Sequence, residues 1–166
     1  IGIVERYFHI ASNTAPPLFS SAICIEKNAL HEIEGFPVNV VAGEDLLTWA
    51  KLACRYKIAF SKKITVIYNF YAPDEWMMFA RKQDEDDIVG SALEGLLADC
   101  ASDCKDLEEY IVFWYRMRLY NFMKIGDRPN AGVELQKIFK YSGIDYKACI
   151  LYFMTLIPEY IKRFIL

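Results

Sequence analysis

Hydrophobic and polar positions follow different patterns in the two parts of the chain, and the change falls near residue 72. Before it, short apolar runs are separated by glycine, proline and charged residues, which is typical of strands that alternate with short helices. After it, apolar residues recur at helical spacing almost throughout. We therefore expect an α/β part over residues 1–72, a helical C-terminal extension over residues 73–166, and a helix-rich chain overall.

The first part is expected to contain two helices and several short strands. The strongest pattern lies in residues 43–56, which predict an amphipathic helix with Trp49 in the core and Thr48 on the polar side. The apolar positions that define this helix are Leu46, Trp49, Ala50 and Ala53. The other predictions are a loop or weak helix over residues 1–19, a buried strand over 21–26, a short helix over 27–33, and strands over 58–60 and 63–70.

The second part predicts helices bounded by aspartate at their starts and glycine at their ends. Residues 110–123 are apolar almost all round, which favours a helix buried between others and leaves an oligomer or membrane contact as the alternative. The predicted helices cover residues 74–82, 87–101, 105–124, 129–141 and 146–166, the last with a break at Pro158. The expected caps are Asp103 or Asp106, Asp127 and Asp145, and the expected stops are Gly126 and Gly143.

Charge and cysteine content exclude some classes of function. The net charge of -3 gives no general attraction to nucleic acid. Five cysteines without zinc-finger spacing favour reduced thiols in a cytoplasmic setting. Cys100 and Cys104 lie one helical turn apart and could share a ligand. Since the neighbouring sequence offers no two further ligands, it predicts no metal site there. His9 and His31 have no partner at motif spacing and are expected at the surface.

An acidic pair, Glu44-Asp45, occupies the first turn of the helix predicted over residues 43–56. The positive end of the helix dipole favours negative charge at this position. A carboxylate within hydrogen-bond reach of a sugar hydroxyl can take its proton as a new bond forms. On spacing alone, a helix start that carries no chemistry is the favoured interpretation of the pair.

The order of elements around this pair resembles the C-terminal half of the catalytic domain of family 2 glycosyltransferases, which have the GT-A fold. The resemblance covers residues 19–69, about a third of the chain. It rests on the small residues and strand of Ser20-Ser21-Ala22-Ile23-Cys24-Ile25, then Lys27, Gly35-Phe36, Gly43-Glu44-Asp45, Trp49-Ala50-Lys51-Leu52 and Tyr68-Asn69.

The resemblance implies an enzyme that transfers a sugar from a nucleotide sugar to a carbohydrate or lipid-linked acceptor with inversion, in the synthesis of a surface polysaccharide. It implies that Asp45 is the catalytic base and that Glu44 orients the acceptor or the helix start. Ser20 and Ser21 lie where the family lines the donor-sugar pocket. Trp76, just past the last predicted strand, is a candidate for stacking on the acceptor sugar, with core packing as the alternative.

Several departures from the family pattern limit what the chain is expected to do alone. Leu47 stands where many members have a further acid, and Asn69 stands where many have a metal-binding histidine. The Gln-x-x-Arg-Trp signature of processive synthases is not in the sequence. The family's nucleotide-binding half, with its Asp-x-Asp, should precede this region. We therefore expect a fragment whose complete enzyme uses Mg²⁺ or Mn²⁺, and no metal held by this chain. Residues 84–87 read as a solvated helix boundary.

The C-terminus suggests a membrane surface as a second environment. After Pro158 an apolar face is opposed by Lys162 and Arg163, as in helices that lie in a membrane interface, although core packing gives the same pattern. The apolar positions are Tyr160, Ile161, Phe164 and Ile165. We expect a cytoplasmic protein that can be peripheral on the inner membrane face and can form homo-oligomers. The competing hypothesis is a non-catalytic helical module for interaction or membrane association, derived from such an enzyme.

Overall fold

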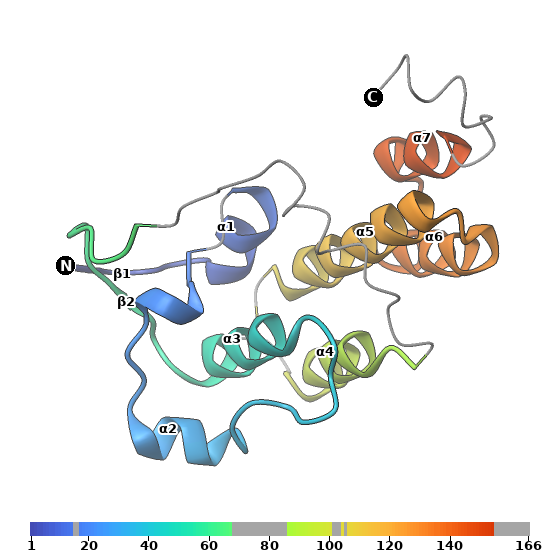
Figure 1. Ribbon diagram of the computed structural model, residues 1–166. Helices are drawn as coiled ribbons and strands as arrows, with labels where there is room; N and C mark the ends of the chain where they lie inside the picture. The colour runs from blue at the N-terminus through green and yellow to red at the C-terminus, as the bar shows by residue number, and fades with distance from the viewer. Residues whose placement is uncertain (15–16, 68–85, 101–103, 105, 155–166) are drawn as a thin grey trace. The chain divides into compact units, whose positions relative to one another are not determined.

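Helices make up most of the described chain (Figure 1). The computed structural model describes residues 1–14, 17–67, 86–100, 104 and 106–154. The helices are α1 (Tyr7–Asn13), α2 (Lys27–Glu32), α3 (Glu44–Arg55), α4 (Ile88–Asp99), α5 (Leu107–Ile125), α6 (Arg128–Ser142) and α7 (Tyr146–Met154), with a 3₁₀ turn, η1, at Ser20–Ala22. Two strands, β1 (Gly2–Ile3) and β2 (Ala59–Phe60), complete the elements. The chain is therefore helix-rich, as predicted.

The residues divide into two compact units. The N-terminal unit combines Ile1–Phe70 with Asp84–Ile111, and the C-terminal unit combines Tyr71–Gln83 with Val112–Leu166. The boundary falls within α5. The division predicted at residue 72 lies in the range 68–85, outside the described residues.

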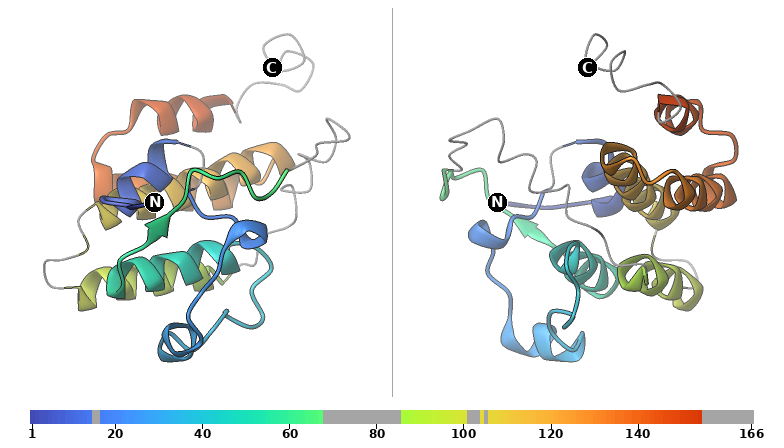
Figure 2. Two further views of the ribbon diagram at one scale, coloured as in Figure 1. Left: turned by 90° about the vertical axis from the view of Figure 1, so that its left-hand side faces the viewer. Right: turned by 45° about the vertical axis from the view of Figure 1, so that its right-hand side comes forward.

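Packing of α3 against α4, which lie side by side in Figures 1 and 2, forms the core of the N-terminal unit together with contacts between α3 and α1. Trp49 and Ala50 are almost completely buried on α3, and Leu93 is buried on α4. Thr48 is also buried, contrary to its expected place on the polar side, because its hydroxyl donates to the Glu44 carbonyl oxygen at 2.7 Å and so needs no water. The predicted helix over 43–56 and its buried tryptophan are confirmed.

Helix α1 was expected only as a loop or weak helix, and it is instead part of the core. Its Tyr7 and Phe8 are buried, and the Phe8 ring centroid lies 5.4 Å from that of Tyr110 on α5. Arg6, just before the helix, donates from Nε to a carboxylate oxygen of Asp106 at 2.9 Å. A short helix of this kind gains its stability from tertiary contacts that its own sequence does not reveal.

The described sheet has two short strands. β1 and β2 pair antiparallel, with Gly2 opposite Phe60 and Ile3 opposite Ala59. The prediction of a strand over 58–60 is therefore confirmed in part. The predicted buried strand over 21–26 is wrong: residues 20–22 form η1, and Ser21 and Cys24 are exposed. The strand over 63–70 is wrong for residues 63–67, which are exposed and unpaired in strands, and 68–70 lie outside the described residues. Short apolar runs become strands only where a neighbouring strand accepts them.

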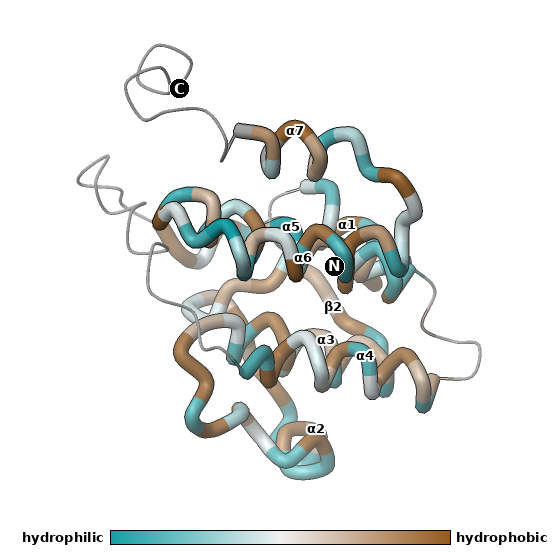
Figure 3. Tube along the Cα trace, turned by 90° about the vertical axis from the view of Figure 1, so that its right-hand side faces the viewer, coloured by the Kyte–Doolittle hydropathy of each residue, from teal (hydrophilic) through white to brown (hydrophobic). Residues whose placement is uncertain are grey.

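The C-terminal unit is built from α5 after residue 111, α6 and α7. Its core includes Trp114, Leu119, Ala131 and Ile138, and α6 packs against α7. The predicted buried character of 110–123 is confirmed, and Asp127 caps α6 by accepting from the Asn130 amide at 3.2 Å. Most of α7 has the colour of hydrophobic residues in Figure 3. The predicted helix over 74–82 and the part of the last predicted helix after residue 154 lie outside the described residues.

A buried ion pair joins α5 to α6 in this unit. Arg118 donates from Nε to Glu134 at 3.0 Å, and both side chains are almost completely buried. The guanidinium also lies 5.3 Å from the ring centroid of Phe122. Two charges removed from water in this way favour each other strongly, but their desolvation offsets much of that gain.

Replacing one partner of this pair should destabilise the C-terminal unit. Glu134→Leu leaves the Arg118 charge buried without its carboxylate, and we expect the free energy of unfolding to fall by about 3–5 kcal/mol in urea titrations. Adding Arg118→Met should recover much of the loss, because both charges are then removed together. The control is Gln136→Leu, exposed on the same helix. A Glu134→Leu protein as stable as the wild type would contradict the role of the pair.

Asp145 starts α7 and should make this unit sensitive to acid. Burial pushes the pKa of Asp145 upward, but hydrogen bonds from Arg116 and the amides of Ala148 and Lys147 outweigh it and lower the pKa below its ordinary 3.8. A lowered pKa contributes stability above pH 3.8, and this stability is lost as the pH falls through the folded-state pKa.

We therefore expect wild type to exceed Asp145→Asn in urea midpoint at neutral pH, with the gap narrowing below about pH 4. Asp99→Asn, an exposed aspartate at the end of α4, is the matched control for loss of one carboxylate. A gap that stays constant from neutral pH to pH 3 would rule out this linkage.

Candidate functional site

The start of α3 positions the two predicted acidic residues. Gly43 precedes the helix with φ 88°, a left-handed conformation that suits a residue without a Cβ. Glu44 is exposed and Asp45 is half-buried, both in the first turn. One carboxylate oxygen of Asp45 accepts from the Leu46 amide at 2.7 Å. Within the described residues, Asp45 forms no salt bridge. Its other carboxylate oxygen can therefore accept a further hydrogen bond.

Two buried tyrosines from other helices lie near this carboxylate. The pKa of Tyr7 is raised, first by burial, with a hydrogen bond to Tyr110 opposing and the charge of Asp45 adding to the rise. The pKa of Tyr110 is raised by burial, by Tyr7 and by Asp45. Tyr110 also donates its hydroxyl to the Leu46 carbonyl oxygen at 3.2 Å. Both phenols therefore stay neutral, and they fix the first turn of α3 against α1 and α5.

The remaining predicted site residues are not brought to Asp45 by any described contact. Ser20 and Ser21 are exposed in η1, and within the described residues neither hydroxyl bonds to Glu44 or Asp45. Trp76 lies outside the described residues. The structure thus places Glu44 and Asp45 in the first turn of α3. The roles expected for these two residues, for the two serines and for Trp76 all remain predictions.

His9 has an acidic partner that its sequence neighbourhood does not reveal. Its Nδ1 lies 2.8 Å from Glu109 Oε2, and Asn13 donates to Glu109 Oε1 at 2.7 Å. The partner is 100 residues away in sequence, so no motif spacing could have found it. The nearby Ser12 hydroxyl donates to the Phe8 carbonyl oxygen at 2.7 Å. This cluster ties α1 to the start of α5, and its serine is engaged with the backbone rather than with the histidine.

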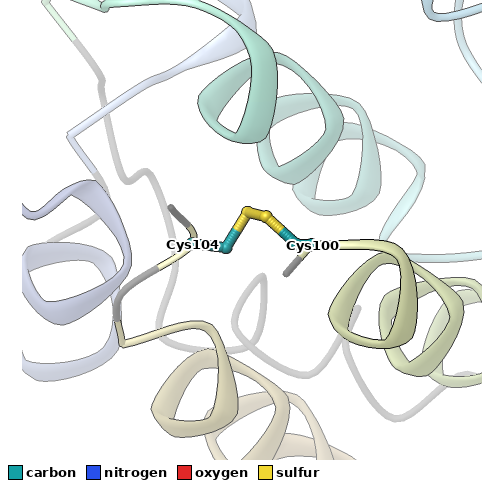
Figure 4. The surroundings of a disulfide bond; sticks show 2 residues. All are labelled: Cys100 and Cys104. Atoms are coloured by element: carbon teal, nitrogen blue, oxygen red, sulfur yellow. A yellow bond between two sulfur atoms is a disulfide. The ribbon is translucent and has the colours of Figure 1, made fainter. Parts of the chain in front are cut away.

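The cysteines differ from the sequence-based expectation. Cys100 and Cys104 are joined in a disulfide, shown in Figure 4, rather than present as reduced thiols. Their Cα atoms are 6.0 Å apart, a separation within the range usual for a disulfide. Cys24, Cys54 and Cys149 have free thiols. The Cys54 sulfur lies within 4.8 Å of both disulfide sulfurs.

The surroundings of Cys54 disfavour its thiolate. Burial raises the pKa of Cys54 to about 11, although the neighbouring Arg55 charge acts in the opposite direction. Cys24 is exposed on the surface of the same unit. The two thiols should therefore differ in reactivity, since the thiolate is the nucleophile.

The chain was compared with known proteins, and no protein-family model, curated protein or solved structure matches it. Among the described helices, none combines the length and the apolar character needed to cross a bilayer. The resemblance in the sequence and the geometry of the site therefore carry the functional argument.

Iodoacetamide should label Cys24 before Cys54 in the folded protein. At neutral pH we expect Cys54 to react at least about tenfold more slowly than Cys24. Its rate should keep rising as the pH is raised toward 10, because the pKa of Cys54 lies above that range. Peptide mass spectrometry after timed quenching measures both rates. In urea the two cysteines should react alike, which is the control. Equal rates in the folded protein would contradict the burial of Cys54.

Proposed function

We propose that the chain is the acceptor-side part of an inverting glycosyltransferase of the family 2, GT-A type. It would transfer a sugar from a nucleotide sugar to a carbohydrate or lipid-linked acceptor in surface polysaccharide synthesis. The observation that carries the proposal is Asp45: a half-buried carboxylate at the start of α3, outside any described ion pair, within the motif order of the family.

In this proposal Asp45 acts as the general base. The acceptor hydroxyl gives its proton to the free carboxylate oxygen while its own oxygen attacks the anomeric carbon of the donor. The bond from that carbon to the diphosphate oxygen breaks, and the nucleoside diphosphate leaves with the electron pair. Attack from the opposite side inverts the anomeric centre. The neighbouring phenols of Tyr7 and Tyr110 stay neutral, so they add no charge that competes with Asp45 for the proton.

The Gly35-Phe36 turn packs against α3, so two parts of the sequence motif are in contact in the structure. Gly35 has φ 73°, which lets the chain reverse after α2. Phe36 then lies edge-on against Trp49, with ring centroids 5.7 Å apart. The Gly35-Phe36 turn is thereby packed on the helix that carries Asp45. This contact gives a reason for the turn, the acidic pair and the tryptophan helix to occur together.

The proposal also assigns roles on the donor side and to the acceptor. Mg²⁺ or Mn²⁺ would neutralise the departing diphosphate in the complete enzyme. Glu44 and Asp45 are not proposed as its chelating pair, because adjacent helical residues diverge by about 100°. Ser20 and Ser21 are proposed for the donor-sugar pocket, and Glu44 with Trp76 for the acceptor.

A second candidate function is a non-catalytic helical module for interaction or membrane association. The observation that favours it is the exposed apolar surface of α7, where Tyr146, Ile150 and Phe153 are each more than half exposed. The proposed localisation, cytoplasmic and peripheral on the inner membrane face, fits either candidate. The residues after Pro158 that suggested membrane contact lie outside the described residues.

Asp45→Asn in the full-length protein that carries this chain should abolish transfer. Because the amide cannot accept the hydroxyl proton, we expect kcat to fall by about 10²–10⁴-fold with donor affinity unchanged. The measurement is acceptor-dependent release of nucleoside diphosphate from a panel of nucleotide sugars, beside donor binding by calorimetry.

Asp99→Asn is the matched control, since it removes an exposed carboxylate in the same unit. Full turnover by Asp45→Asn would show that Asp45 is not the general base. A wild-type protein that releases no nucleoside diphosphate from any donor and acceptor, yet binds lipid vesicles or a second copy of itself, would favour the module.

A further inference from the structure

Three cysteine sulfurs converge in the N-terminal unit, although one of them lies far from the others in sequence. The sulfur atoms of Cys54, Cys100 and Cys104 all lie within 4.8 Å of one another. Cys54 stands in the last turn of α3, Cys100 ends α4, and Cys104 precedes α5. All three side chains are half-buried, so the cluster is fixed by the fold and still open to a small ion.

The packing of α3 against α4 brings the three positions together. The backbone amide of Cys100 donates to the Leu96 carbonyl oxygen at 3.0 Å and closes the last turn of α4. The Cys100 and Cys104 Cα atoms, 6.0 Å apart, allow their sulfurs either to bond or to separate by side-chain rotation. Cys54 is held on a helix whose neighbouring residues, Ala53 and Leu52, face the interior at least in part. Three ligand atoms are therefore preassembled on separate elements.

We propose that the reduced forms of Cys54, Cys100 and Cys104 make a three-thiolate site for Zn²⁺, and that the Cys100–Cys104 disulfide is the oxidised, metal-free form of the same site. The proposal does not depend on the function proposed for Asp45. Thiolates are the ligands that select Zn²⁺ among the common divalent cations. Three protein ligands leave the fourth tetrahedral position to water or to an incoming ligand.

The required movement is small. A Zn–S bond of about 2.3 Å in tetrahedral geometry places the sulfur atoms about 3.8 Å apart. Cys54 already lies within 4.8 Å of both partners, so a shift of about 1 Å of its sulfur is enough. Cys100 and Cys104 must part from their bonded position, which their Cα separation permits.

A dithiol or a phosphine can reduce the Cys100–Cys104 disulfide and so convert the oxidised form of the site into the metal-binding form. A dithiol gives two electrons and two protons to the Cys100–Cys104 disulfide and becomes a disulfide itself. With a phosphine, water supplies the oxygen of the phosphine oxide and the two thiol protons. Zn²⁺ then replaces three thiol protons, which are released to solvent. In the reverse direction a small-molecule disulfide takes up the two electrons and, with two protons from solvent, is reduced to two thiols while Cys100 and Cys104 rejoin. This removes two of the three ligands and frees the ion.

The experiment uses the full chain, reduced with a phosphine under anaerobic conditions and titrated with Co²⁺ as a spectroscopic probe. We expect a sulfur-to-cobalt charge-transfer absorption that saturates at one ion per chain and is displaced by Zn²⁺. Cys54→Ser and Cys100→Ser should each lose this absorption. Cys24→Ser and Cys149→Ser, which lie outside the cluster, should retain it. The oxidised wild type should bind no Co²⁺.

A second measurement needs no variant and so is independent of folding defects. In the reduced wild type, Zn²⁺ should protect Cys54, Cys100 and Cys104 from alkylation while Cys24 and Cys149 still react, as read by peptide mass spectrometry. Absence of a charge-transfer band together with no protection would overturn the proposal. Binding that survives Cys54→Ser would also overturn it, because two thiolates would then suffice. Exchange of the disulfide partner to Cys54 on mild reduction, without metal uptake, would assign the cluster to thiol–disulfide exchange instead.

Discussion

Burial of the apolar face of α3 is the interaction on which the N-terminal unit depends. Trp49 and Ala50 have almost no exposed surface, and Leu47 is buried beside them. Burying a large apolar side chain contributes about 1.5–3 kcal/mol, and α3 buries several. The same burial fixes both ends of the helix, so the acidic first turn and the cysteine of the last turn are positioned by one packing arrangement.

Polar contacts then orient α3 rather than hold it in place. Lys51 donates to the Ile33 carbonyl oxygen at 3.3 Å, and Arg55 donates to the Glu32 carbonyl oxygen at 2.6 Å. Tyr56 hydrogen-bonds to the Glu32 side chain. These bonds satisfy carbonyl groups at the end of α2 that have no partner within that helix. They set the orientation of α2 relative to α3, while the apolar core supplies most of the stability.

Apart from α1, the helices could be predicted from the sequence because their signals are local. The spacing of Leu46, Trp49 and Ala50 and the cap residues Asp127 and Gly143 each act within a few residues. The strands could not, because pairing depends on partners elsewhere: residues 21–26 have strand composition but gain no neighbour within the described residues. The burial of Thr48 also escaped prediction, since one hydrogen bond within its own helix satisfies its hydroxyl.

For the candidate sites, the same distinction between local and distant signals applies. Glu44 and Asp45 adjoin each other at a helix start, so the sequence alone could indicate their place. The pairing of His9 with Glu109 and the approach of Cys54 to Cys100 and Cys104 arise from helix packing across long stretches of chain. Sequence spacing holds no record of such contacts, and the cysteine cluster was for this reason not expected to gain a third ligand.

The ribbon formed by β1 and β2 has a consequence for how the chain behaves at high concentration. Within the described residues neither strand has a second neighbour. Ile1, Ile64 and Ile67, which precede or follow the strands in the sequence, are at least four-fifths exposed. Unpaired backbone donors and acceptors near exposed apolar side chains can form hydrogen bonds with an extended segment of another chain. A charged residue in place of Ile64 or Ile67 would disfavour the pairing of such a segment with this edge.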